Sequence, residues 1–181
     1  MRSKFLQRSE LINQTSMVAD AAGHPYIATY WRDSGSSVPQ YRIIYKYGSQ
    51  WKSENPGFRK TPFSLSGGGT KAIPVSRPQI IAWQSGKAVS AALIFRDVER
   101  GSKASAAITT DISKGNWKMI DLTATSVGSW EPSYDTELWK EKGVLNLFVQ
   151  KVEQVDGEGK ANVAPQMVKV LEWKPVLEVG K

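Results

Sequence analysis

The chain has 181 residues, a formal net charge of +7 and 40% hydrophobic residues, which is the size and composition of one soluble globular domain. It contains no cysteine and one histidine, His24, so disulfides, thiolate metal sites, His-pair metal sites and a His-based triad within this chain are excluded. We therefore expect no metal and no cofactor. No apolar run has the length of a membrane span, and no apolar stretch follows the basic start at residues 1–4, so we expect no membrane segment and no signal peptide here.

The positive charge is spread along the whole chain. Even its densest stretch, residues 96–103, alternates with Asp97 and Glu99, and no nucleic-acid-binding motif is present. A mixed-charge surface of this kind predicts no nucleic-acid partner. An acidic polysaccharide is the other polyanion that a basic protein attracts.

Three short turns recur along the chain, at residues 20–23, 84–86 and 140–143. We predict an apolar strand before each turn and a longer strand after it. The longer strands and those that follow them cover residues 25–31 and 40–47, 89–95 and 103–110, and 144–151 and 165–173. No segment shows a long helical period, so the sequence predicts an all-β fold with little helix.

The repeat unit is about 60 residues long and holds three or four strands, which selects a β-propeller built of four-stranded blades. The predicted blades are residues 16–60, 77–123 and 136–179, with residues 1–15 as the end of a preceding blade. Three blades leave two open faces, because repeat units bury their apolar faces against neighbours. The chain is therefore either part of a longer propeller that lacks its N-terminal blades, which we favour, or a unit that self-associates.

Two long loops interrupt the repeat. The loop at 52–76 contains Gly67-Gly68-Gly69, which lacks the spacing of a phosphate-binding loop and predicts a glycine turn. The loop at 124–135 contains four candidate substrate-binding residues, Trp130, Glu131, Tyr134 and Asp135, because aromatic rings stack on sugars and carboxylates bind hydroxyls. The alternative is architectural: Trp130 fills a gap between blades, and the carboxylates bind turn amides.

Tyrosines and arginines supply the candidate catalytic residues. Tyr26 and Tyr30 share one face of a predicted strand, and Arg42 lies on the next strand, where a guanidinium could lower the pKa of a phenol. Packing is the alternative for these tyrosines. Arg32 and Arg96 each precede an aspartate at a strand end, which indicates either a structural Arg–Asp pair or a uronate-binding arginine.

Several segments together resemble the BNR-repeat-containing carbohydrate-active family, including glycoside hydrolase family 145 α-L-rhamnosidases and ulvan lyases of polysaccharide lyase families 24 and 25. The segments are DAAGHPYIATYW at 20–31, VPQYRIIY at 38–45, RKTPFSLSGGGTK at 59–71, SRPQI at 76–80, FRD at 95–97 and SWEPSYDTELW at 129–139. The resemblance covers roughly residues 5–175 and corresponds to the C-terminal part of a seven-bladed propeller.

The resemblance implies an acidic substrate that contains rhamnose and glucuronate, with hydrolysis favoured over elimination. It implies catalytic roles for Tyr26 or Tyr30 and Arg42, a catalytic histidine outside this chain, and a periplasmic or secreted location. Lyase members can also carry a structural metal held by His and Cys, which this composition does not supply. The predicted substrate-binding residues are Arg77, Arg96, Trp130, Glu131, Tyr134 and Asp135. A non-catalytic carbohydrate-binding propeller and a protein-interaction propeller remain the alternatives.

Overall fold

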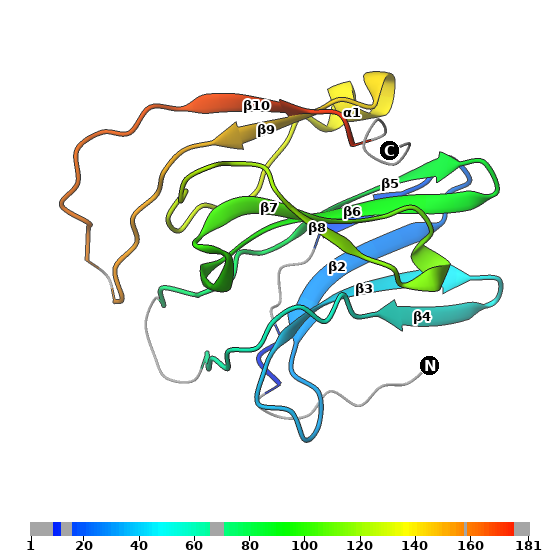
Figure 1. Ribbon diagram of the computed structural model, residues 1–181, viewed down its shortest axis with the longest axis horizontal. Coiled ribbons are helices and arrows are strands. Elements are labelled where there is room, and N and C mark those ends of the chain that lie inside the picture. The colour runs from blue at the N-terminus through cyan, green and yellow to red at the C-terminus, as the bar shows by residue number, and fades with distance from the viewer. Residues whose placement is uncertain (1–8, 12–15, 66–70, 158, 176–181) are drawn as a thin grey trace.

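The computed structural model describes residues 9–11, 16–65, 71–157 and 159–175 (Figure 1). These residues form a nearly all-β protein, as predicted, and none of their helices is long and apolar enough to cross a membrane. The predicted glycine turn at 67–69 lies outside the described residues. The strands are β1 (Ser16–Ala19), β2 (Pro25–Trp31), β3 (Gln40–Tyr47), β4 (Gln50–Glu54), β5 (Gln79–Ser85), β6 (Ala88–Asp97), β7 (Lys103–Thr109), β8 (Lys118–Asp121), β9 (Leu145–Val149) and β10 (Lys169–Trp173).

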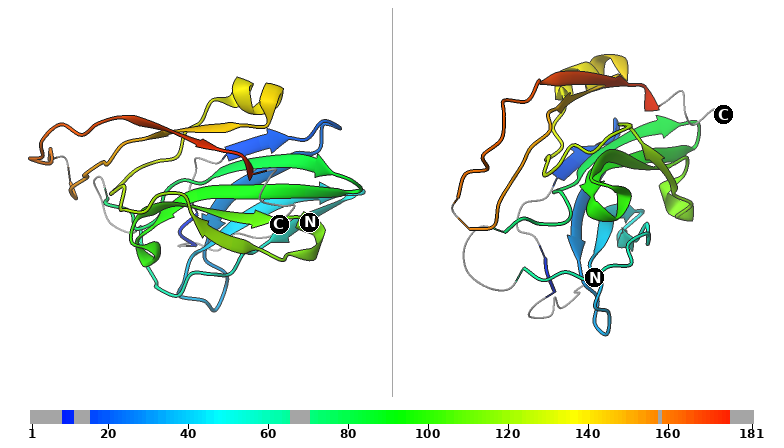
Figure 2. Two further views of the ribbon diagram at one scale, coloured as in Figure 1. Left: turned by 45° about the horizontal axis from the view of Figure 1, so that its top comes forward. Right: turned by 60° about the vertical axis from the view of Figure 1, so that its left-hand side comes forward.

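The strands form antiparallel sheets in which neighbours in the chain are neighbours in space. The first sheet has the order β1-β2-β3-β4 and the second β5-β6-β7-β8, while β9 and β10 form a third, two-stranded sheet. The three sheets lie one above another in chain order, with β5–β8 in the middle (Figures 1 and 2). Two short 3-10 helices, η1 (Val98–Arg100) and η2 (Ile112–Lys114), lie in the turns of the second sheet.

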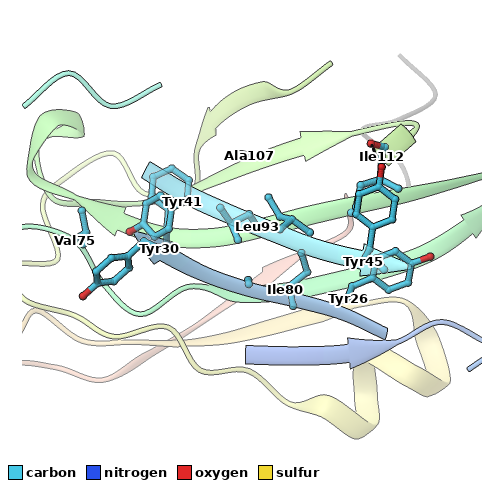
Figure 3. Packing of buried hydrophobic residues seen from close by; sticks show 14 residues of the cluster. Tyr26, Tyr30, Tyr41, Tyr45, Val75, Ile80, Leu93, Ala107 and Ile112 are labelled. Atoms are coloured by element: carbon cyan, nitrogen blue, oxygen red, sulfur yellow. Dashed lines mark hydrogen bonds between the residues drawn. The ribbon is translucent and has the colours of Figure 1, made fainter. Parts of the chain in front are cut away.

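The first core layer lies between the first and second sheets. Alternation along β2 and β3 places the side chains of Tyr26, Tyr30, Tyr41 and Tyr45 on the same buried face, where they pack against the second sheet (Figure 3). The two pairs, Tyr26–Tyr45 and Tyr30–Tyr41, lie at opposite ends of the sheet. The second sheet contributes smaller residues to this layer, with Leu93 of β6 at its centre.

The second core layer lies between the second and third sheets. The facing side of the second sheet is rich in alanine and isoleucine, so the third sheet and its preceding loop can approach closely with large side chains. Its largest members are Trp130, Trp139 and Trp173. The second sheet is therefore buried on both faces, which explains the near-continuous burial of β6.

The third repeat departs from the prediction. Where a strand and a tight turn were expected, the chain forms helix α1 (Thr136–Lys142). Asp135 caps the N-terminus by accepting bonds from two backbone amides, and Gly143 ends the helix in the left-handed conformation at φ 62°. The edge strand is replaced by residues 133–135, where Tyr134 bridges Leu147 of β9.

Candidate functional site

Four side chains from four parts of the chain meet at one end of the first two sheets. Tyr30 comes from β2, Arg77 precedes β5, Arg96 lies near the end of β6, and Glu131 lies in the loop that follows β8. We call Tyr30, Arg77, Arg96 and Glu131 the Arg–Glu cluster. All four are among the residues that the sequence singled out.

Glu131 is the centre of this cluster. Its Oε2 accepts a hydrogen bond of 2.8 Å from the backbone N–H of Arg77, and its carboxylate lies 3.7 Å from Arg96 Nη2 and 3.9 Å from Arg77 Nη1. Burial raises the pKa of Glu131, although Arg77 and Arg96 act in the opposite direction. The two guanidinium groups therefore converge on a carboxyl group that holds its proton more tightly than a solvated glutamate.

The two arginines differ in how firmly their side chains are held. The side chain of Arg96 is 3% exposed and donates hydrogen bonds to the carbonyls of Ile73, at 2.9 Å, and Trp130, at 3.3 Å. The side chain of Arg77 is 44% exposed, and its ion pair with Glu131 is longer than a hydrogen bond. Arg96 is thus fixed by the fold, whereas Arg77 can turn towards a bound anion.

Tyr30 is buried beneath this cluster. Its ring makes edge contacts with Tyr41 and Phe63, and its hydroxyl has no hydrogen-bond partner among the described residues. Burial, with a further contribution from the charge of Glu131, raises the pKa of Tyr30 to about 12, although Arg77 and Arg96 act to lower it. The phenol is therefore protonated at neutral pH and retains an unused donor.

A fully buried phenol supports the backbone of the cluster. The hydroxyl of Tyr41 lies 3.1 Å from the carbonyl of Ser76 and 3.2 Å from that of Arg96. The hydroxyl oxygen of Ser76 accepts a 2.8 Å bond from the Arg96 N–H. Tyr41 thus connects the first sheet to the two segments that carry the arginines, a role that the sequence did not single out.

Tyr26 and Arg42 lie away from this cluster. Tyr26 donates a 3.0 Å hydrogen bond to Asp20 at the other end of the sheet, and burial raises its pKa. Arg42 is paired with Thr29, so it projects from the opposite face of the sheet, where it bonds Asp33 and stacks on Trp31. The predicted contact between a phenol and Arg42 is therefore wrong. Paired residues on neighbouring strands share a face, and Arg42, paired with Thr29, lies on the face opposite to Tyr26 and Tyr30.

The loop at 124–135 contains residues with a structural role and residues that line a surface cleft. Trp130 is buried in the second core layer and donates a 2.8 Å bond from Nε1 to the carbonyl of Phe148, and Asp135 caps α1. Both observations match the architectural alternative. Tyr134 and Asp135 also line a cleft of about 410 Å³ on the third sheet, away from the Arg–Glu cluster. The other lining residues are Ser133, Asn146, Phe148 and Val170.

The expected Arg–Asp pairs form with different partners. Asp33 pairs with Arg42, and Asp97 pairs with Arg59, whose Nε lies 2.6 Å from the carboxylate in a fully buried site. Arg32 instead donates to the carbonyl of Ser36. Arg59 lies in a loop without periodicity, so no pattern in the sequence indicated its partner.

Among the described residues, no group of three His, Cys, Asp or Glu side chains is placed to hold a metal ion. The arrangement at the Arg–Glu cluster instead suits the recognition of an anionic group, since planar guanidinium groups bind carboxylates in two-pronged fashion.

Residues 2–59 match the sequence model of the BNR repeat-containing family member. The match covers the first sheet and the start of the loop that follows it. No curated protein matches the chain. BNR repeats are found in carbohydrate-active enzymes such as sialidases. The fold and this match together define a nearly all-β protein of stacked antiparallel sheets that carries a BNR repeat.

Proposed function

We propose that the chain is part of a β-propeller enzyme that acts on an acidic polysaccharide containing rhamnose and glucuronate. The BNR match and the two consecutive four-stranded sheets support a propeller, with blades at 16–60, 77–123 and 136–179. A periplasmic or secreted location accords with such a substrate. The observation that carries the proposal is the convergence of Arg77 and Arg96 on Glu131, beside a buried phenol, Tyr30, whose hydroxyl has no partner in the described part of the chain.

In this proposal the uronate carboxylate binds the arginines. Arg77, with its exposed guanidinium, makes the first contact, and Arg96 supplies a fixed charge beneath it. The buried hydroxyl of Tyr30 donates a hydrogen bond to the bound sugar once a small movement of the cluster admits it. The substrate displaces Glu131 from the arginines. The pKa of Glu131 then rises further, because the positive charges of Arg77 and Arg96 now stabilise the uronate carboxylate instead.

The protonation states favour hydrolysis over elimination. Elimination needs a base that removes the proton beside the uronate carboxylate. A tyrosine with a pKa of about 12 is almost entirely protonated at neutral pH, so Tyr30 is poorly suited to act as that base. Hydrolysis needs a group that protonates the leaving oxygen, which suits a carboxyl group with a raised pKa. Glu131 is therefore the proposed proton donor, and the remaining catalytic groups, including a histidine, would come from other blades.

Calorimetric titration with a rhamnose–glucuronate oligosaccharide tests the proposal. We expect binding to the wild-type chain, loss of most of that binding in Arg77→Ala, and no change in the exposed control Lys118→Ala. Duplex DNA serves as the polyanion control. Absence of saccharide binding, or equal loss in both variants, would contradict the assignment of the cluster.

A non-catalytic saccharide-binding propeller is the second candidate, favoured by the burial of Tyr30, which restricts access to the one phenol in the cluster. It predicts the same dependence on Arg77 but no turnover. Hydrolysis releases a reducing end, and elimination forms an unsaturated uronate that absorbs ultraviolet light, so the two enzyme reactions and simple binding are distinguishable in one incubation.

A further inference from the structure

A polar cleft of about 480 Å³, separate from the cleft that Tyr134 lines, opens between the second and third sheets. One wall is the loop after β8, with Thr125 and Ser126. The other wall is the end of β9 and the start of β10, with Gln150 and Lys169. Both walls belong to the described chain, and the cleft adjoins the second core layer rather than an outer face of the stack. No residue of the Arg–Glu cluster lines it, so it is a separate site.

The side chain of Lys169 lies on the inner face of the third sheet. Lys169 pairs with Val149, and alternation along β10 places it on the same side as Leu171 and Trp173, which pack in the second core layer. A charged side chain on a core face needs either a partner or access to solvent. Lys169 is exposed and makes no ion pair within the described residues, so its ammonium group is available where the core layer opens into the cleft.

Hydroxyl and amide groups line the same cleft. Ser126 Oγ accepts a 3.1 Å bond from a backbone N–H, which leaves its own O–H as a donor. Gln150 Nε2 donates to the carbonyl of Gln166 at 3.0 Å, which leaves Gln150 Oε1 as an acceptor. Lys151 adds a second ammonium group, 3.2 Å from Glu153, and no aspartate or glutamate is among the described residues of the lining. These groups together suit a hydroxylated anion, such as a sugar that carries a carboxylate.

The cleft and the Arg–Glu cluster are carried by the same loop. Val127 lines the cleft and Glu131 lies in the cluster, so their Cα atoms are at most about 14 Å apart along the chain. The segment between them is held by Val152, whose N–H donates to the carbonyl of Val127 at 3.1 Å and whose carbonyl accepts a 2.7 Å bond from the N–H of Ser129. The two sites are therefore close enough, and firmly enough connected, for one saccharide chain to reach both.

We propose that this cleft binds a second uronate of the acidic saccharide that occupies the Arg–Glu cluster. Lys169 binds the carboxylate, and Ser126 and Gln150 bind hydroxyl groups of the same sugar or its neighbour. The inference rests on the proposed function and adds a preference for saccharides with more than one uronate. Because both contacts are made by one ligand, the second contact is intramolecular and raises the affinity without any change at the cluster.

Calorimetric titration with rhamnose–glucuronate oligosaccharides of increasing length tests the proposal. We expect the affinity of the wild type to rise at least about tenfold from a disaccharide with one uronate to oligosaccharides with two or more. Lys169→Glu should abolish this gain and leave the affinity for the disaccharide unchanged, whereas Arg77→Ala should weaken binding at every length. The control is Lys87→Glu, the same change of charge at an exposed lysine in the turn between β5 and β6; it should bind like the wild type.

The possible failures of the cleft and of the cluster are distinguishable. Disaccharide binding that depends on Arg77 but does not strengthen with length would overturn the cleft and leave the cluster intact. Equal losses in Lys169→Glu and Lys87→Glu would also overturn the cleft, because they indicate attraction by net charge alone. Absence of binding at every length would contradict both sites. Binding of the longer oligosaccharides that requires Lys169 but not Arg77 would support the cleft and contradict the proposed role of the cluster.

Discussion

Tyr30 and Tyr41 are paired across β2 and β3 and their rings are in edge contact, but their hydroxyls have opposite hydrogen-bonding environments. The Tyr41 hydroxyl faces the carbonyls of Ser76 and Arg96, whereas the Tyr30 hydroxyl is buried and has no partner among the residues that the structure describes. We therefore expect Tyr41→Phe to lower the free energy of unfolding by about 1–2 kcal/mol, because two buried carbonyls lose a donor. Tyr30→Phe should change it by no more than about 0.5 kcal/mol, since only an unsatisfied polar group is removed.

Urea unfolding of the two variants measures this difference, and each serves as the control for the other because both remove one oxygen from a buried ring. Equal destabilisation would show that the Tyr30 hydroxyl has a partner in solution. If the Arg–Glu cluster binds saccharide as proposed, Tyr30→Phe should weaken that binding while leaving stability unchanged, which is the pattern expected of a ligand-binding residue.

Gly128 approaches a neighbouring backbone more closely than any side chain would allow. It has φ +63°, and a Cβ at this position would lie 2.0 Å from the carbonyl oxygen of Val152. We expect Gly128→Ala to destabilise the chain by at least about 2 kcal/mol, from the left-handed backbone together with the displacement of residue 152. The control is Gly86→Ala, with φ +61° and no atom within 4 Å of the added Cβ.

Thermal unfolding of the two glycine variants isolates the close approach. The control should show only the backbone cost, about 1 kcal/mol. Equal losses for the two variants would mean that the segment at 152 moves aside without cost.

At the scale of elements, one carboxylate holds the loop after β4 on the second sheet. Glu99 of η1 accepts hydrogen bonds from the backbone amides of Lys60 and Thr61, and lies 3.5 Å from Arg59. Burial opposes ionisation of Glu99, but the two amides and Arg59 outweigh it and hold its pKa below the ordinary value of 4.5. The ionised form is therefore the one that the folded state stabilises.

The stability contributed by Glu99 should be fully present above about pH 4.5 and decrease as the pH falls through the lowered pKa in the folded state. We expect Glu99→Gln to be less stable than the wild type by about 1 kcal/mol at pH 7, and the difference to shrink between pH 4.5 and 3. Urea unfolding of both proteins across this pH range provides the measurement. A difference that stays constant with pH would show that the charge of Glu99 is not what holds the loop.

The sequence predicted elements well wherever alternation and aromatic residues coincide. The predicted strands at 25–31 and 40–47 match β2 and β3, because tyrosine and isoleucine alternate there with residues of the outer face. The third repeat was mispredicted because the residues at 140–143 belong to the last turn of a helix. Asp135 caps this helix, and Glu137 and Lys140 form an i, i+3 ion pair on it. We aligned this segment with the turns of the other two repeats and so gave these helix signals no weight.

The site was predicted only in part, since register decides which side chains meet. Arg77, Arg96, Glu131 and Tyr30 were all singled out, but no pattern in the sequence indicated that they converge. They do so because Glu131, 54 residues from Arg77 along the chain, bonds the backbone N–H of Arg77. Arg42 was grouped with the tyrosines because it lies on the next strand, yet pairing with Thr29 turns it to the other face.

At the scale of the whole molecule, the three sheets differ in how many of their faces are covered. The second sheet is packed on both faces, by the tyrosine layer on one side and the tryptophan layer on the other. Within the described residues the third sheet is packed on one face, and its outer side chains Phe148 and Val170 are exposed. In stacked repeats, stability is a sum of unit terms and contacts between neighbours, so the end units are the first to open.

Hydrogen exchange should therefore be slowest in β6 and clearly faster in β9. These two strands form a matched pair, because each is hydrogen-bonded along both edges: β6 by β5 and β7, and β9 by β10 and residues 133–135. A difference between them reports the covering of sheet faces rather than the number of backbone hydrogen bonds. Mass spectrometry of the exchanged chain, digested into peptides from each strand, provides the measurement. Equal protection of β6 and β9 would mean that the third sheet opens only when the whole chain unfolds, and that the three layers form one cooperative unit.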